Sequence, residues 1–192
     1  LCRSIMKLLP DNARMKSGQI LLDSADVTGY RERDMRRLRG RMFSMIFQDP
    51  MTSLNPTLPI GRQIGEAVLV HQPKLKRAAV RRRVLELMEL VGIEDPEARY
   101  SLYPHNFSGG MRQRSVMAIA LAANPRLLFA DEPTTALDVT IQAQILDLLR
   151  DIQQKLGTAA VLVSHDLGVV ARAADRVAVM YAGKIVETGT VE

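Results

Sequence analysis

The sequence predicts an α/β fold, and three features of the chain support this class. The runs LLFA (127–130) and AAVLVS (159–164) are apolar without alternation, as in strands of a parallel sheet covered on both faces. Helix and strand patterns alternate from residue 108 onward, whereas the segment 50–107 reads as helical. The chain has 192 residues, 47% of them hydrophobic, which is enough for one buried core. We therefore expect one α/β domain with an inserted helical section.

The elements before residue 108 follow from local patterns. A short helical pattern at the start of the chain ends at Pro10, and SGQILLDSADV (17–27) then reads as a strand. A second strand, RMFSMIFQ (41–48), stops at an Asp-Pro dipeptide. After a loop rich in turn-forming residues, helices are predicted at 62–70 and 76–91, and the second of them is amphipathic.

Composition narrows the function classes. No apolar run approaches the roughly 20 residues that a membrane-spanning helix needs, and LCRSIMKLLP has no secretory-signal pattern. The single cysteine, Cys2, cannot form an internal disulfide, which suits a reducing cytoplasm. Much of the net charge of +5 comes from RERDMRRLRGR (31–41) and KLKRAAVRRR (74–83). Neither cluster contains aromatic residues for base stacking, so solvated helix faces are favoured over nucleic-acid or membrane-surface binding.

An acidic pair follows the apolar run LLFA, where the chain leaves the strand. This position places Asp131 and Glu132 at the carboxyl edge of the sheet, where open α/β folds bind ligands. Asp131 can hold Mg²⁺ through its water shell, and Glu132 can orient or deprotonate an attacking water. The same pair, taken alone, suits an ordinary turn at a strand end equally well.

A possible anion site lies at the start of the next predicted helix along the chain. Ser108 can cap this helix, and Gly109 and Gly110 follow it. The unpaired amides and the dipole of a helix N-terminus both favour negative charge. A glycine-containing cap without any ligand is the alternative.

Three more polar residues follow strands or precede helices. Gln48 can ligate a metal or a water, although a lone amide at a strand end is usually a surface group. His165 can contact a terminal phosphate, although structural histidines are more common. Asp138 can act in the same site or simply cap the helix that begins near Val139.

Taken in order, these residues resemble the ATPase subunit of an ABC transporter over essentially the whole chain. The matching segments are Gln48 for the Q-loop, SGGMRQ (108–113) for the signature motif, LLFADE (127–132) for Walker B, ALD (136–138) for the D-loop and His165 for the switch histidine. Each motif alone is weak, so the resemblance depends on all five in this order. Three longer segments resemble the dipeptide, oligopeptide and nickel importer branch of this family. They are DPMTSLNPTLPIG, YPHNFSGGMRQR and DEPTTALDVTIQAQIL.

The resemblance implies a P-loop NTPase (RecA-like) fold that binds ATP and Mg²⁺. Residues 1–49 and 108–192 would form a partial parallel-sheet core, and 50–107 an inserted α-helical subdomain, with the signature helix starting at 108. The implied catalytic residues are Glu132, His165 and Gln48, and the implied metal ligands are Asp131 and Gln48. The implied nucleotide-binding residues are Ser108, Gly109, Gly110, Gln113 and Asp138.

The resemblance also implies partners and a location. Two such domains would pack head to tail, so that residues 108–110 of one face the γ-phosphate held by the other. The pair, a homodimer or a heterodimer, would power transmembrane permease subunits and, indirectly, an extracytoplasmic solute-binding protein. We expect a peripheral protein on the cytoplasmic face of the inner membrane, with no nucleic-acid partner. The loop 51–60 is expected to meet the permease, because its prolines stiffen it and Met51, Leu54, Leu58 and Ile60 make it apolar.

One motif of the family is missing from the chain. The phosphate-binding P-loop, G-x-x-x-x-G-K-[ST], is absent, and LCRSIMKLLP resembles the helix that follows it. We therefore expect a fragment that binds ATP weakly and hydrolyses none by itself. Two alternatives stay open: a soluble ABC ATPase that acts on DNA or ribosomes, and an inactive module.

Overall fold

A three-stranded parallel sheet forms the centre of the computed structural model, which describes residues 1–135 and 137–191. Its strands, in spatial order, are β3 (Phe43–Ile46), β4 (Leu127–Asp131) and β5 (Ala159–Val163). Ile46 pairs with Ala130, and Asp131 pairs with Val163. The carboxyl ends of all three strands therefore meet at one edge, and the predicted α/β class is confirmed.

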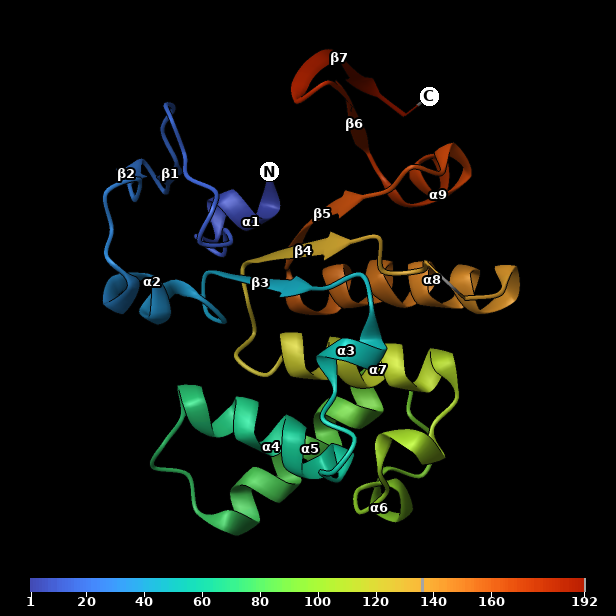
Figure 1. Cartoon of the computed structure of the whole chain (residues 1–192). Coiled ribbons are helices and arrows are strands. Elements are labelled where there is room, and N and C mark those ends of the chain that lie inside the picture. Colours follow the sequence, from blue (N-terminus) through green and yellow to red (C-terminus); the bar gives the residue numbers. More distant parts are fainter. Residues whose placement is uncertain (136, 192) are drawn as a thin grey trace.

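The chain between β3 and α7 (Gly109–Ala120) is helical (Figure 1). Its elements are α3 (Pro50–Ser53), α4 (Ile60–His71), α5 (Arg77–Leu90), α6 (Pro96–Arg99) and the 3-10 turn η1 (Pro104–Asn106). Helices α4 and α5 begin and end within two residues of the predicted helices. Helix α3 replaces part of the predicted loop, because the hydroxyls of Thr52 and Ser53 both donate to the carbonyl of Asp49 and support one helical turn.

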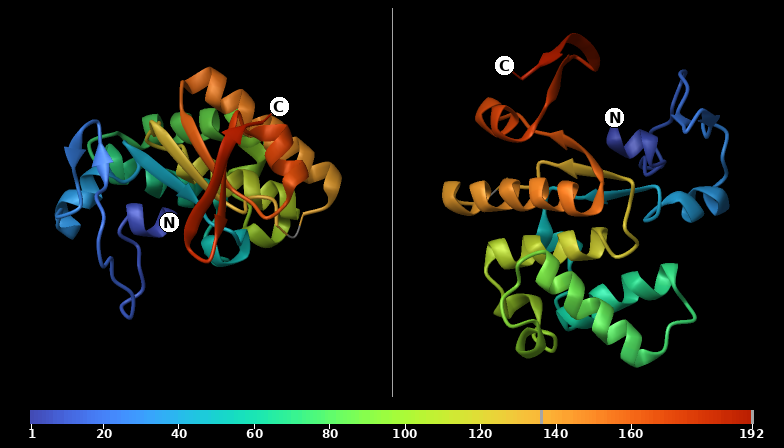
Figure 2. Two further views of the ribbon diagram at one scale, coloured as in Figure 1. Left: turned by 90° about the horizontal axis from the view of Figure 1, so that it is seen from above. Right: turned by 180° about the vertical axis from the view of Figure 1, so that it is seen from behind.

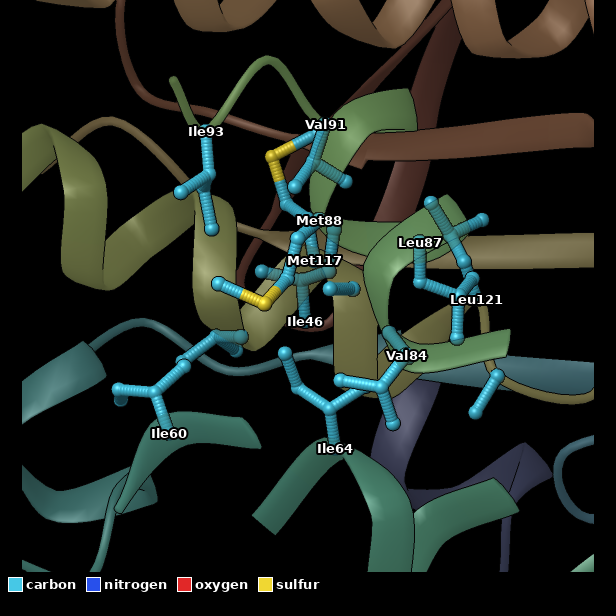
Figure 3. Packing of buried hydrophobic residues seen from close by; sticks show 14 of the residues in the cluster. Ile46, Ile60, Ile64, Val84, Leu87, Met88, Val91, Ile93, Met117 and Leu121 are labelled. Carbon is cyan, nitrogen blue, oxygen red and sulfur yellow. The ribbon is translucent and has the colours of Figure 1, made fainter. Parts of the chain in front are cut away.

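Helices α4, α5 and α7 bury one continuous apolar cluster against β3. Figure 3 shows its centre, with Ile60 and Ile64 from α4, Val84, Leu87 and Met88 from α5, Met117 from α7 and Ile46 from β3. Each of these side chains is fully buried. Leu54 is buried in the same cluster, so the expectation that Leu54 and Ile60 face a permease is wrong: they pack inward. The Arg114 guanidinium adds a polar tie, since Nη1 donates to the carbonyl of Val91 at 2.7 Å. The amphipathic pattern predicted for α5 therefore faces this cluster.

After β4, the chain continues through α8 (Val139–Leu156), β5 and α9 (Leu167–Ala173), and then forms a hairpin that begins with β6 (Arg176–Tyr181). Within the described residues, β6 pairs antiparallel with β7 (Lys184–Thr190) and lies outside the three-stranded sheet. Ala182 and Gly183 both adopt positive φ and reverse the chain between the two strands. Figure 2 shows this hairpin projecting away from the three parallel strands.

The first forty residues form small elements beside the sheet. They are α1 (Cys2–Ile5), β1 (Leu21–Leu22), β2 (Ala25–Asp26) and α2 (Glu32–Leu38). The single strand predicted over 17–27 is wrong: Asp23 and Ser24 have φ of 48° and 68°, and the segment folds back as a hairpin. The Arg39 guanidinium donates to the carbonyls of Met6 and Lys7 and so ties the end of α1 to the end of α2.

Candidate functional site

The ends of the three parallel strands bring the sequence-predicted polar residues together. Gln48 lies two residues after β3, Glu132 directly follows β4, and His165 lies two residues after β5. Because neighbouring parallel strands end at the same edge, residues that are 84 and 33 positions apart in the sequence meet there. Sequence patterns give the strand ends, and the sheet order β3-β4-β5 places Glu132 between its two partners.

Glu132 is the centre of a hydrogen-bond network. Its Oε2 atom accepts from Nε2 of Gln48 at 3.0 Å and from Oγ1 of Thr135 at 2.9 Å. Its Oε1 atom lies 3.1 Å from Nδ1 of His165. The Glu132 side chain is 24% exposed and the His165 side chain 77% exposed, so the network stands at the surface with its carboxylate partly shielded.

The backbone conformation of Glu132 sets the direction in which its side chain leaves the turn. Its φ is 48°, in the left-handed region that few non-glycine residues adopt. The Glu132 amide donates to the carbonyl of Val163 at 3.0 Å, and the Thr135 amide donates to the carbonyl of Glu132 at 3.2 Å. The turn after β4 is therefore held both to β5 and to itself. Unusual backbone conformations of this kind gather at functional sites.

The surrounding donors keep the Glu132 carboxylate ionised. The hydrogen bond to His165, followed by that to Thr135, lowers the pKa of Glu132, and the bond to Gln48 acts in the same direction. At neutral pH the side chain is therefore an acceptor only. Chemically, it can take a proton from a water or orient that water.

Asp131 and Gln48 supply the donor chemistry that Mg²⁺ prefers. Asp131 is the last residue of β4, half-buried, with a carboxylate that can bind through water. Gln48 donates to Glu132 through Nε2, so this bond does not involve the Oε1 oxygen of Gln48. The oxygen atoms of both side chains thus fit a magnesium site, and their role as ligands stays a prediction.

The start of α7 has the expected cap. Ser108 is the N-cap residue, and its hydroxyl accepts from the amide of Met111 at 3.4 Å. Gly110 packs against α8 so closely that a Cβ there would lie 2.7 Å from Cγ2 of Ile141. A glycine is required at this contact for a steric reason that is independent of any ligand. The anion-binding role of Ser108, Gly109 and Gly110 stays a prediction.

Two further predicted residues have structural contacts. Gln113 is 1% exposed, on the inner side of α7, and its Nε2 finds no hydrogen-bond partner within residues 1–135 and 137–191. Asp138 caps α8, since its carboxylate accepts from the amide of Ile141 at 2.9 Å. The capping alternative for Asp138 is thus observed. Of the D-loop segment ALD, Ala136 lies outside the described residues, as does the side chain of Met51.

Thr135 is the partner of Glu132 that sequence reasoning missed. It sits in the string DEPTTALD between the acidic pair and the D-loop and belongs to neither. A local pattern could have found it. A serine or threonine three positions after an acidic residue, within a tight turn, can donate a hydrogen bond to the acidic side chain.

Comparison with known proteins defines the class. The profile that describes ABC transporters matches residues 2–135, more than half of the chain, and the chain therefore belongs to the ABC transporter family. The structure agrees in fold with the dimeric structure of MJ0796, a bacterial ABC transporter cassette, with a TM-score of 0.80 at 25% identity. That match covers 92% of this chain and 75% of the other. The fold is thus an α/β P-loop NTPase of the ABC ATPase type.

Two curated relatives are more similar in sequence. The chain is 58% identical to the oligopeptide transport ATP-binding protein OppD of Bacillus subtilis (strain 168), over 99% of this chain and 53% of that protein. It is 57% identical to the dipeptide transport ATP-binding protein DppD of the same strain, over 98% of this chain and 56% of that protein. The chain therefore spans about half the length of these relatives.

Proposed function

We propose that the intact protein is the ATP-hydrolysing subunit of an ABC importer for oligopeptides or dipeptides. The observation that carries this proposal is the network in which Gln48, Glu132 and His165 meet at the strand ends. The names of the two peptide-transport relatives support the substrate class. In this proposal residues 1–49 and 108–192 belong to the nucleotide-binding core, and 50–107 form the helical subdomain.

The chemistry assigns a task to each residue of the network. Glu132 accepts a proton from the attacking water, which its ionised state allows. Asp131 and the amide oxygen of Gln48 hold Mg²⁺, which supplies charge neutralisation at the phosphates when bound. His165, 77% exposed, is free to turn toward the terminal phosphate. This assignment uses every polar group predicted at the strand ends.

A second copy or a paired ATPase completes the site in this proposal. Ser108, Gly109 and Asp138 act on the nucleotide that the partner domain holds, whereas Gly110 and Gln113, expected to bind it as well, are buried and support the start of α7 from within. The exposure of Ser108 and Gly109 on the surface, at the N-terminus of α7, supports this role. ATP binding would close the pair, and hydrolysis would release it. The dimeric form of the related cassette supports the same arrangement.

The substitution Glu132→Gln tests the catalytic assignment in the intact protein. The amide keeps the size of the side chain but accepts no proton, so we expect ATP binding to persist while hydrolysis slows by about 10²-fold or more. Dimers stabilised by ATP should accumulate, which size-exclusion chromatography detects. Glu187→Gln on the exposed hairpin is the matched control. Near-parental turnover in Glu132→Gln would rule out Glu132 as the base.

A cavity beside the site supports contact with a permease. It has a volume of about 510 Å³ and lies where the end of β3, helix α3 and helix α7 meet. Gln48 and Thr52 line it together with the apolar side chains of Val116 and Ile119. A partner segment seated there would contact the same turn that carries Gln48. We propose that the permease subunits contact the loop 51–60, whose Thr52 lines this cavity, on the cytoplasmic face of the membrane.

Crosslinking tests the docking proposal. Thr52 and Thr57 are exposed, so each can carry a cysteine once Cys2 is replaced. The partners are single cysteines in the cytoplasmic loops of the co-expressed permeases. We expect crosslinks whose yield changes with ATP. An assembled, active complex that gives none from either position would overturn the docking proposal, and failure to assemble with the permeases at all would favour the soluble ABC ATPase. No helix in the described parts of the chain is long and apolar enough to span a membrane.

The chain of 192 residues is a different case from the intact protein. It contains no G-x-x-x-x-G-K-[ST] segment, so most contacts to the β- and γ-phosphates are missing. By itself it should bind Mg-ATP very weakly and hydrolyse none. Isothermal titration tests this expectation, and micromolar affinity would contradict it.

A further inference from the structure

Thr135 is the one donor to Glu132, among the described residues, that has no role in the proposed function. Gln48 and His165, the other two, are assigned to the metal and the terminal phosphate. The Thr135 hydroxyl donates to Oε2 of Glu132 at 2.9 Å, the shortest of the three contacts. We propose that Thr135 is a positioning residue for ATP hydrolysis, which holds the Glu132 carboxylate in place. This inference rests on the proposed role of Glu132 as the base.

The contact of Thr135 with Glu132 is more local than the contacts of the other two donors. Gln48 follows β3 and His165 follows β5, so both contacts depend on the placement of other strands. The Thr135 contact instead lies within a single turn, closed by the bond from the Thr135 amide to the Glu132 carbonyl at 3.2 Å. Thr134, in the middle of this turn, is buried and anchors it. The Thr135–Glu132 pair therefore moves as one unit with the end of β4.

The consequence concerns the reacting state. When Gln48 and His165 turn toward other partners, Oε2 of Glu132 keeps the hydroxyl of Thr135. Without that hydroxyl, the carboxylate is free to rotate away from the water that it must orient. Misplacement of a catalytic group by about 1 Å can cost as much as 10²-fold in rate. We expect an effect of about tenfold for one hydrogen bond.

Thr135→Val in the intact protein removes the hydroxyl and keeps the shape, and Thr135→Ser keeps the hydroxyl. For Thr135→Val we expect kcat to fall about tenfold, with KM and the affinity for a fluorescent ATP analogue unchanged within about twofold. Thr135→Ser should restore most of the rate. In a crystal structure of Thr135→Val, the Oε2 atom of Glu132 should be displaced from the position that it has in the parent protein. Thr140→Val, an exposed position on α8, is the matched control.

Three outcomes decide between the inference and its premise. Parental kcat in Thr135→Val, with Glu132→Gln inactive, overturns the role of Thr135 and leaves the proposed function intact. Parental turnover in Glu132→Gln overturns both. Losses in affinity and kcat together, not rescued by serine, assign Thr135 to stability of the fold and overturn the inference. Thr135→Ala repeats the test without a β-branched side chain, should valine disturb the turn.

Discussion

Two regions of the molecule differ sharply in how their apolar residues are covered: the helices packed on the parallel sheet, and the β6–β7 hairpin. In the first region, α4, α5 and α7 enclose the cluster around Leu87, which is 0% exposed (Figure 3). In the second, Ile185 is 56% exposed, and Val179, Met180, Tyr181 and Val186 are exposed as well. Apolar composition is similar in both regions, so composition alone does not decide burial. Helices that pack on three neighbours bury their apolar faces, and a lone hairpin has no second layer.

The candidate site lies at the boundary between these two regions. Gln48 continues from β3 toward the buried helices, whereas His165 follows β5 on the side of the hairpin. Glu132 bridges them through bonds of 3.0 Å and 3.1 Å. A change in the placement of either region therefore alters the bonds of the same carboxylate, as the proposed coupling of hydrolysis to movement requires.

The sequence was sufficient for the strands that carry the site. The run LLFA is unbroken because β4 is the central strand and is buried on both faces, and Glu132 directly after it marks the sheet edge. The run AAVLVS also forms a parallel strand, but the expected cover on both faces is wrong there, since Val161 and Val163 are exposed on one face of β5. The order of the strands is not local information, yet it decides that Glu132 lies between Gln48 and His165. The resemblance to a known family, which spans the whole chain, supplied the assignment that local patterns left open.

What the sequence could not provide depends on contacts between distant segments. Gln113 reads as polar, and its burial on α7 becomes visible only with the neighbouring helices in place. His71 lies against Gly40, a contact across 31 positions that no periodicity encodes. The small hairpin at 21–26 depends on two residues with positive φ, Asp23 and Ser24, which are not glycine. Such features arise from tertiary packing, which overrides local preference.

Leu87→Ala should show the largest effect, on the buried side of the comparison. The side chain is fully enclosed, so its removal leaves a cavity, and the free energy of unfolding should fall by about 2–5 kcal/mol. Urea denaturation measures this change. Leu85→Ala, half-buried on the same helix, is the control and should lose less than half as much. Equal losses for both would show that the cluster is loosely packed.

Gly110→Ala should show an intermediate effect at the contact between α7 and α8. The new Cβ would lie 2.7 Å from Cγ2 of Ile141, so one helix must shift, at a cost of about 1–3 kcal/mol. Gly109→Ala is the matched control, because its Cβ would stand 3.4 Å from Cδ2 of Leu137, an ordinary contact. Both variants gain the same helix propensity, so their difference in urea midpoint isolates the steric term. No difference would mean that α8 yields freely.

His71 should make the buried side weakly sensitive to pH. Burial, with a smaller contribution from Arg41, lowers the pKa of His71 from its ordinary value of 6.5. The unfolded chain then binds the proton more readily, so the stabilisation is present above pH 6.5 and is lost as pH falls toward the lowered pKa. The urea midpoint should therefore drop less between pH 7 and 5 in His71→Gln than in the parent. His105→Gln, which replaces an exposed histidine, is the matched control for the loss of an imidazole.

Ile185→Thr on the exposed side should show the smallest effect. The side chain is already 56% exposed, so little apolar area returns to water on unfolding, and threonine keeps the β-branched shape that strands favour. The free energy of unfolding of the 192-residue chain should change by no more than about 0.5 kcal/mol. Measured in urea beside Leu87→Ala, this variant tests the comparison directly. A loss close to that of Leu87→Ala would mean that β7 is covered in solution by another surface, and the contrast between the helical cluster and the hairpin would disappear.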